Sequence, residues 1–435
     1  MSIRTQTSSD HAASSTSMPH PRSPKTCFVL PDGHGLGGVT NWTIQQARAL
    51  TKLGHRCEIL EHVNTSLGWK EATPPELAWR TIYGRHPGVA RPEDVPVFAY
   101  YYGEAAPAVV VPNYTDGAYA ACAAVAMRHP ESIRVLGVAH TDQGYYYDLL
   151  QHYEPILTLI LAVSEEIADR LRQLLPHRAD DIRVRPYGVA VPTRLKRTWS
   201  KHGQPLRITY AGRIVEEQKR VLDLPRLAER LDQKGVDFSL HIYGTGDTEP
   251  LLQDAIARLP ASTQGRIHME GRARTDTMNA VWAKSDIAVL MSEFEGTSIS
   301  MLEAMAQGCV PVVTRVSGTR QAILDGLTGL TTPIGDVESM ASGIAALTLD
   351  RAQVETMGRA AHAHVRDHFG LDAYTAWLAN LLDEAWSKAP RTTPAGFELI
   401  RPRYEAPPPE PPPYVRYSLK RFFGKVRKRI DQWVN

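Results

Sequence analysis

The stretch Ser292–Gly308, SEFEGTSISMLEAMAQG, decides the fold of this chain. It follows an apolar run at 286–291 of the kind that a buried parallel strand uses, and a second such run occupies 309–313. Between the two runs apolar residues recur at helical spacing, and Gly308 is well placed to end the helix. The pattern predicts strand, loop, helix and strand, the repeating unit of a parallel α/β sheet.

Two glutamates in this stretch, Glu295 and Glu303, are separated by seven residues. The first is expected in the loop at the carboxyl end of the strand, where ligands of open α/β sheets bind, and the second in the first turns of the helix. Gly296, Thr297 and Ser298 lie where the helix begins, and the unpaired backbone N–H groups of a helix start favour an anion. The alternative is an ordinary βαβ unit with two solvated glutamates.

This block resembles the Glu-x7-Glu signature of the retaining glycosyltransferases of family 4, which have two Rossmann-like domains. The resemblance implies that Glu295 contacts the donor sugar and that Glu303 holds the nucleotide ribose. It further implies that the helix start, with Gly296, Thr297 and Ser298, receives the diphosphate of the donor.

A second motif pairs Arg213 with Lys219, six residues apart. Fixed cations stabilise a leaving diphosphate as it gains negative charge, and Arg can bind phosphate oxygens through two hydrogen bonds. In the family, a Gly-Arg pair and a following Lys-Gly pair bind the donor diphosphate. Here Arg220 stands where Gly is usual. The alternative is a pair of solvated basic residues at a helix start.

Three further features recur in the order that the family has them. His140 follows an apolar run, and in the family a His at this point reaches the donor sugar or the reacting oxygen, whereas elsewhere a His at a strand end is most often structural. Gly37 and Gly38 belong to a glycine-rich loop that resembles the family's Gly-Gly loop near the donor phosphate and the acceptor, and the loop does not fit a dinucleotide fingerprint. Gly244 opens a Gly-x-Gly at the expected place.

Three consecutive tyrosines, Tyr145–Tyr147, lie shortly after His140. Their rings would suit an acceptor pocket, because aromatic faces stack on sugar rings. The alternative is half-buried packing.

Alternating apolar runs and amphipathic stretches predict an α/β protein with two Rossmann-like parallel-sheet domains. The resemblance implies that these domains face a cleft, as in the GT-B architecture. The chain is expected to open with a strand at 25–31, a helix at 41–53 and a strand at 57–60. The expected segments are a disordered leader (1–24), an acceptor-side domain (25–195), a nucleotide-sugar-binding domain (196–370), a helix that crosses back to the first domain (371–388), a proline-rich spacer (389–413) and a basic amphipathic helix (414–435).

Composition excludes several classes of protein. The four cysteines are scattered without the spacing of a zinc site or a disulfide framework, which favours a reducing compartment. No Asp-x-Asp occurs, so the usual carboxylate clamp for a metal on a nucleotide diphosphate is missing, and we expect neither a metal nor a cofactor. No run of 18 apolar residues is present that would span a bilayer, and residues 1–25 lack the apolar region of a signal peptide.

The positive charge of the chain lies in its tail. Residues 389–435 hold ten Lys/Arg against four Asp/Glu, a net charge of +6, whereas the rest of the chain carries −4, which argues against a nucleic-acid partner. Within 414–435, apolar residues recur at three- and four-residue steps between basic ones, as in a helix that lies on an anionic membrane. A helix packed on the body or on a second copy is one alternative, and disorder is another. We expect a cytoplasmic protein held at the inner face of the membrane.

These features together predict a retaining, metal-independent glycosyltransferase. It would move a sugar from a nucleotide-diphosphate sugar to a glycan or lipid-linked acceptor, in the synthesis of cell-surface polysaccharide or glycolipid. One alternative is a sugar-nucleotide 2-epimerase, which shares the two-domain architecture. The other is a catalytically inactive, membrane-associated scaffold of the same fold, against which the presence of both cations and both glutamates argues.

Overall fold

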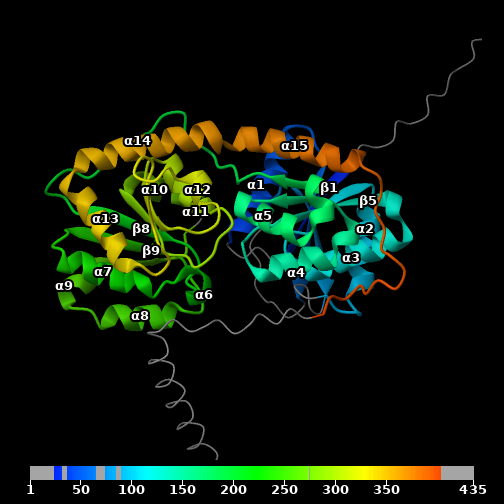
Figure 1. Cartoon of the computed structure of the whole chain (residues 1–435), viewed down its shortest axis with the longest axis horizontal. Coiled ribbons are helices and arrows are strands. Elements are labelled where there is room, and N and C mark those ends of the chain that lie inside the picture. The colour runs from blue at the N-terminus through cyan, green and yellow to red at the C-terminus, as the bar shows by residue number, and fades with distance from the viewer. Residues whose placement is uncertain (1–23, 32–36, 65–73, 85–89, 274, 403–435) are drawn as a thin grey trace, which may run out of the picture.

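The computed structural model describes residues 24–31, 37–64, 74–84, 90–273 and 275–402. Two parallel sheets, each covered by helices, form two domains side by side (Figure 1). The predicted α/β class with two parallel-sheet domains is confirmed. The predicted leader and the predicted amphipathic helix fall outside the described residues, apart from Pro24.

The first domain contains a sheet of seven strands in the order β3-β2-β1-β4-β5-β6-β7, all parallel. The strands are β1 (Lys25–Pro31), β2 (Cys57–Asn64), β3 (Ala78–Gly84), β4 (Ala108–Val111), β5 (Ile133–Ala139), β6 (Leu157–Ala162) and β7 (Ile182–Val184). Its helices are α1 (Gly38–Lys52), α2 (Val95–Ala105), α3 (Asp116–Arg128), α4 (Gly144–His152) and α5 (Glu165–Leu174), with short 3-10 turns at Pro130–Ser132, Glu154–Ile156 and Pro176–Asp181.

The second domain contains a sheet of six parallel strands in the order β10-β9-β8-β11-β12-β13. The strands are β8 (Leu206–Ala211), β9 (Phe238–Tyr243), β10 (Ile267–Gly271), β11 (Ile287–Leu290), β12 (Val310–Thr314) and β13 (Leu330–Thr332). The helices are α6 (Glu216–Lys219), α7 (Asp223–Gln233), α8 (Glu249–Ala257), α9 (Ala261–Gln264), α10 (Thr275–Lys284), α11 (Ile299–Ala306), α12 (Thr319–Ala322), α13 (Val337–Leu349), α14 (Arg351–His368) and α15 (Leu371–Ser387).

The central strands read as continuous apolar runs because helices cover both faces of each sheet. Every residue of β4, β5, β6, β11 and β12 is buried. Some helices begin at a capping side chain: at the start of α5 the Ser164 hydroxyl accepts from the N–H of Ile167 at 3.3 Å. The first helix begins at Gly38, three residues before its predicted start, and the predicted strand at 57–60 extends to Asn64.

The chain passes between the domains twice, and the two passages are hydrogen-bonded to each other. Residues 185–205 lead from the first sheet to the second, and the chain returns between α14 and α15. The N–H of Val189 donates to the carbonyl of Phe369, and the N–H of Leu371 donates to the carbonyl of Val189, both at 2.9 Å. Helix α15 then lies on the first domain in line with α14 (Figure 1).

The described part of the segment predicted as a proline-rich spacer, residues 389–402, lies against the first domain. We call it the strap. The Thr392 hydroxyl donates to the carbonyl of Ala126 at 3.0 Å, and the buried Arg401 pairs with Asp116 at 3.3 Å. Up to residue 402 the chain is therefore held to α3 and α4 instead of extending freely from the body.

Candidate active site

Glu295 lies in the loop after β11, at the carboxyl edge of the second sheet. Its side chain is buried, with 8% of the residue exposed. Lys219, the last residue of α6, forms an ion pair with its Oε1, and the Ser292 hydroxyl donates to the same oxygen at 2.7 Å. Two residues that are 76 positions apart and belong to two separate motifs therefore meet at one point.

Gln218 joins the two motifs, although its position in the sequence did not mark it as a site residue. Its side-chain oxygen accepts a hydrogen bond from the guanidinium of Arg213. Its amide nitrogen donates to the carbonyl of Phe294 at 3.3 Å, and its backbone carbonyl accepts from the N–H of Glu293 at 2.8 Å. The exposed Arg213 is thus held beside the loop that carries Glu295.

Arg220 occupies the left-handed turn that ends α6, with φ of +47°. This is the conformation that glycine adopts most readily, so the turn is preserved although the residue differs from the family pattern. The guanidinium pairs with Asp223 at 2.9 Å and with Glu293 at 2.7 Å. These ion pairs offset part of the backbone cost of a non-glycine residue here.

Gly244 lies against the loop that carries Arg213. Its φ is +145°, and a Cβ atom there would lie 1.8 Å from the carbonyl oxygen of Gly212. A Cβ at Gly246 would lie 2.4 Å from the carbonyl oxygen of Ile214. Both glycines are therefore needed for close backbone packing under Arg213, which the sequence did not distinguish from a direct ligand contact.

The start of α11 faces the first domain. The Ser298 hydroxyl accepts from the N–H of Met301 at 3.4 Å and so caps the helix. The Thr297 hydroxyl donates to the carbonyl of Val163 in the first domain at 2.5 Å. Across from them, a Cβ at Gly38 would lie 3.7 Å from Cδ1 of Ile299, whereas a Cβ at Gly37 would meet nothing within 4 Å. The end of the glycine-rich loop and the start of α11 therefore adjoin.

Glu303 lies one turn into α11 and is half-buried. Burial raises the pKa of its carboxyl group from 4.5 to about 7. Within the part of the chain that the structure describes, the carboxylate forms no hydrogen bond or ion pair. A half-buried carboxylate without a protein partner is suited to accept hydrogen bonds from a ligand that carries hydroxyl groups.

His140 is buried directly after β5, with 3% of the residue exposed. Its Nε2 lies 3.0 Å from Oδ1 of Asn113, and its Nδ1 lies 2.5 Å from the hydroxyl of Tyr187. Burial lowers the pKa of the ring to about 3. The ring nitrogens are thus occupied by protein groups, and neither partner was marked by the sequence.

The tyrosines that follow His140 in the chain belong to the same part of the first domain. Tyr146 and Tyr147 are buried, and the hydroxyl of Tyr145 donates to the carbonyl of Tyr114 at 2.8 Å. Burial raises the pKa of Tyr146, and the positive charge of Arg213 in the other domain opposes that shift.

The two domains touch across the site. Thr141 and Gly296 form an antiparallel bridge, and the N–H of Asp142 donates to the carbonyl of Glu295 at 2.9 Å. The hydroxyl of Ser317 hydrogen-bonds to the carboxylate of Asp142. A hollow beside Glu295 has a volume of about 10 Å³. Sites for small ligands usually have roughly 300 to 1,000 Å³, so this hollow alone is too small for a nucleotide-sugar.

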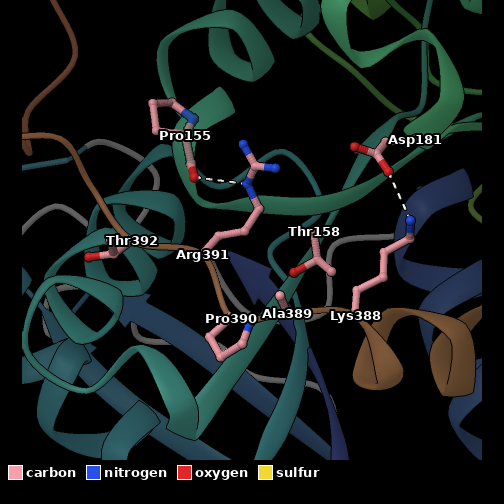
Figure 2. Close-up of a pocket in the computed structure, with 8 residues that line it drawn as sticks. All are labelled: Pro155, Thr158, Asp181, Lys388, Ala389, Pro390, Arg391 and Thr392. Atoms are coloured by element: carbon pink, nitrogen blue, oxygen red, sulfur yellow. Dashed lines mark hydrogen bonds and ion pairs between the residues drawn. The ribbon is translucent and has the colours of Figure 1, made fainter.

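A larger hollow, of about 430 Å³, lies at the opposite end of the first sheet (Figure 2). Its charged side chains are already paired: Lys388 with Asp181 at 3.0 Å, and Arg391 through its Nε with the carbonyl of Pro155 at 3.0 Å. Thr158 lies between them, at the start of β6. The candidate residues lie at the carboxyl ends of the strands, so this hollow is not part of the candidate site.

Comparison with known proteins shows the family and the fold of the chain. Residues 36–191 match the family model described as Glycosyltransferase Family 4, and residues 205–350 match the model described as Glycosyl transferases group 1. The putative colanic acid biosynthesis glycosyltransferase WcaL of Salmonella typhimurium is 27% identical over 54% of this chain and 60% of its own length. The amylovoran biosynthesis glycosyltransferase AmsK of Erwinia amylovora is 30% identical over 41% of this chain and 45% of its own length.

These two alignments span about half the length of the curated relatives. Among solved structures, TarM of S. aureus, in a complex with fondaparinux, α-GlcNAc-glycerol and UDP, superposes with a TM-score of 0.67. The superposition covers 83% of this chain and all of TarM, at 11% sequence identity. At that identity the likeness shows the fold alone.

Proposed function

Because the chain belongs to the family 4 glycosyltransferases of the GT-B fold, we propose that it is a retaining glycosyltransferase that uses a nucleotide-diphosphate sugar. The observation that carries the proposal is the meeting of Lys219 and Glu295 at the start of α11, with Arg213 held beside them through Gln218. Fixed cations and a helix start at one point suit a diphosphate, and the adjoining carboxylate suits the hydroxyl groups of a sugar.

The roles follow from these positions. Arg213 and Lys219 would bind the diphosphate and stabilise its charge as the bond to the sugar breaks, without a metal clamp. Glu295 would contact the sugar, and Glu303 would accept hydrogen bonds from the nucleotide ribose. In front-face substitution, the acceptor oxygen bonds to the anomeric carbon on the side that the diphosphate leaves, and a diphosphate oxygen takes the acceptor proton. The expectation that His140 reaches the donor sugar stays a prediction. In this structure both of its ring nitrogens form hydrogen bonds with protein groups, Asn113 and Tyr187.

The donor is best identified by release of free nucleotide. UDP is bound in the TarM complex, so UDP-sugars come first, with GDP- and ADP-sugars beside them. Glu295→Ala is expected to lower kcat by roughly 10²-fold, because a lost contact in the transition state reduces turnover. Glu303→Ala should weaken nucleotide binding more than turnover. Glu293→Ala is the matched control, because Glu293 is in the same loop but pairs with Arg220. Wild-type kinetics in both Glu295 and Glu303 variants would refute the site.

Neutralising Arg213 or Lys219 should cut activity, whereas EDTA should leave it intact. Loss of activity in EDTA that Mn²⁺ or Mg²⁺ restores would show that a metal binds the diphosphate instead. The same assays separate the 2-epimerase, which turns over UDP-N-acetylhexosamine without any acceptor.

We propose that the acceptor is a glycan or a lipid-linked glycan of surface polysaccharide synthesis, as the names of WcaL and AmsK suggest. Among the described residues no helix is long and apolar enough to cross a membrane. Residues 414–435 would instead dock the enzyme on the anionic inner face of the membrane, as their basic amphipathic pattern suggests. Deletion of these residues should abolish co-sedimentation with anionic liposomes and leave donor hydrolysis intact. Equal liposome binding by the truncated chain would exclude the tail as the anchor.

A further inference from the structure

The buried ring of His140 is held by partners that fix which nitrogen carries its proton. The side-chain nitrogen of Asn113 donates to the carbonyl of Val29 at 2.7 Å and to the hydroxyl of Thr43 at 3.2 Å. A carbonyl can only accept, so the amide orientation of Asn113 is set, and its Oδ1 must face His140. Because Oδ1 also only accepts, the Nε2 of His140 must carry the hydrogen.

The other ring nitrogen is then bare and accepts from Tyr187. The distance between Nδ1 and the Tyr187 hydroxyl is 2.5 Å, the ring centres are 6.1 Å apart, and the ring planes are inclined by only 20°. Tyr187 lies in the first passage between the domains, two residues before Val189, which is hydrogen-bonded to the second passage. One side of the His140 ring therefore contacts the core of the first domain, and the other contacts the first passage between the domains, residues 185–205, which we call the hinge.

The backbone that follows His140 reaches the second domain. A Cβ at Gly296 would lie 2.2 Å from the carbonyl oxygen of His140, so the two segments are in direct contact. The next two residues, Thr141 and Asp142, form the bridge to Gly296 and the hydrogen bond to Glu295. A shift of His140 would move the loop that carries Glu295 or break its contact with the first domain.

We propose that Asn113 and Tyr187 are positioning residues that hold His140 as a neutral ring with its proton on Nε2 and thereby fix the segment 140–142 against the Glu295 loop. Through Tyr187, this contact is tied to the hinge. His140 then serves as a rigid link and not as a carrier of protons. The effect on turnover rests on the proposed function, whereas the state of the ring and the contact across the cleft do not.

The backbone of Asn113 supports a dedicated role. Its φ is +55°, in the left-handed region, where Asn is tolerated far better than most other residues. The residue is fully buried, and its own carbonyl accepts from the hydroxyl of Tyr119 at 3.2 Å. Hydrogen bonds thus hold both the side chain and the backbone of Asn113, and together they fix the position of its amide group.

Tyr187→Phe tests the proposal, because it removes the hydroxyl and keeps the ring. Tyr102→Phe is the matched control: Tyr102 is also buried, and its hydroxyl lies 3.0 Å from Nε2 of another buried histidine, His62. Asn113→Gly is a second variant, since glycine accepts the positive φ but removes the amide. All variants are made in the full chain.

Three measurements decide the outcome. Ring ¹⁵N spectra of histidine-labelled protein should show His140 with its proton on Nε2 and without titration between pH 5 and 8. In Tyr187→Phe the Nδ1 signal should move downfield, and hydrogen exchange at the N–H of Asp142 should become at least about 10-fold faster. Turnover of the donor should fall by about 10-fold or more with little change in KM, because small misplacements of a site cost up to about 10²-fold. Tyr102→Phe should match wild type in all three.

A His140 ring with its proton on Nδ1, or one that titrates between pH 5 and 8, would overturn the proposal. So would equal exchange rates at Asp142 in Tyr187→Phe and Tyr102→Phe. If no donor is turned over by the wild-type protein, the proposed function fails, while the spectra and the exchange rates still decide whether Asn113 and Tyr187 hold His140.

Discussion

At the scale of single residues, burial of the ionised Glu303 carboxylate lowers the stability of the folded protein. Hydrogen bonds from a ligand can offset this loss. Its pKa is raised to about 7 by burial, above the value of 4.5 for an exposed carboxyl. The folded state therefore prefers the protonated form, and its stability falls as pH rises from about 4.5 to 7. Above about pH 7 this loss of stability is complete, and below about pH 4.5 it is absent.

Glu303→Gln should remove this cost, because an amide does not ionise. We expect the variant to be more stable than wild type at pH 8.5, by roughly 1 to 3 kcal/mol, and about equal at pH 4.5. Urea unfolding of both proteins at the two pH values measures the difference. An advantage of the variant that is the same at both values would mean that ionisation of Glu303 is not its cause.

Arg220 shows how a residue outside the family pattern is accommodated. Arg220→Ala should lose the ion pairs with Asp223 and Glu293 and keep the strained left-handed turn. Arg220→Gly should lose the same pairs but relieve the turn, so it should be more stable than the Ala variant by about 1 kcal/mol. Thermal unfolding of the two variants tests this, and equal stability would show that the backbone at this turn is not strained.

At the scale of elements, the strap is held by a buried charge. Arg401 is 6% exposed and pairs with Asp116 and Asp148, and its guanidinium lies 5.3 Å from the centre of the Tyr145 ring. Burial raises the pKa of Asp116 even beside this cation. Removing the cation would leave a buried carboxylate without that partner.

Arg401→Ala should therefore destabilise the protein by roughly 3 to 5 kcal/mol and expose the strap to proteolysis. Arg366→Ala is the control, because Arg366 pairs with Asp367 on the surface, where solvent screens such pairs and they contribute little to stability. The two unfolding curves are compared directly. If the Arg401 variant is no less stable than the control and equally resistant to protease, the strap is not anchored at this point.

The sequence was most informative where the relevant residues are neighbours in the chain. The spacing of Glu295 and Glu303 and that of Arg213 and Lys219 is local, so the motifs could be found without a structure. Gln218 could not be distinguished, because its role comes from contacts with a loop 76 residues away.

Elements with weaker patterns were missed for a related reason. The edge strand β3 has partly exposed residues and lacks a continuous apolar run, so it does not have the pattern of a buried strand. The strap follows a proline-rich pattern that is typical of an extended spacer, yet its anchors, Asp116 and Asp148, lie more than 250 residues earlier. The composition of a segment indicates its conformation in isolation, but it does not indicate which contacts the rest of the molecule makes with it.

At the scale of the whole molecule, the first domain contacts the Glu295 loop directly through Asp142, and the hollow beside Glu295 has a volume of only about 10 Å³. Binding should therefore require the domains to separate at the contacts of Asp142 with Ser317 and Glu295. We expect a cross-link at this place to prevent donor binding.

The pair Asp142→Cys and Ser317→Cys supplies the cross-link, since the two native side chains touch. After oxidation the double variant should lose at least about 10-fold in affinity for the nucleotide-sugar, and reduction should restore it. Calorimetry on both redox forms, with the Asp142→Cys single variant as control, measures the change. Undiminished affinity in the cross-linked form would mean that the donor enters without separation of the domains.

The pairing of Val189 with Phe369 and Leu371 has a consequence for how the halves of the molecule move. Because two segments of backbone joined by hydrogen bonds are harder to twist than one, we expect the domains to rotate about an axis near this pair of segments. We then expect each closure of the domains to follow the same path. Thr141 should then meet Gly296 in the same register at each closure, so that the alignment of the two domains at the site depends on this pair of segments.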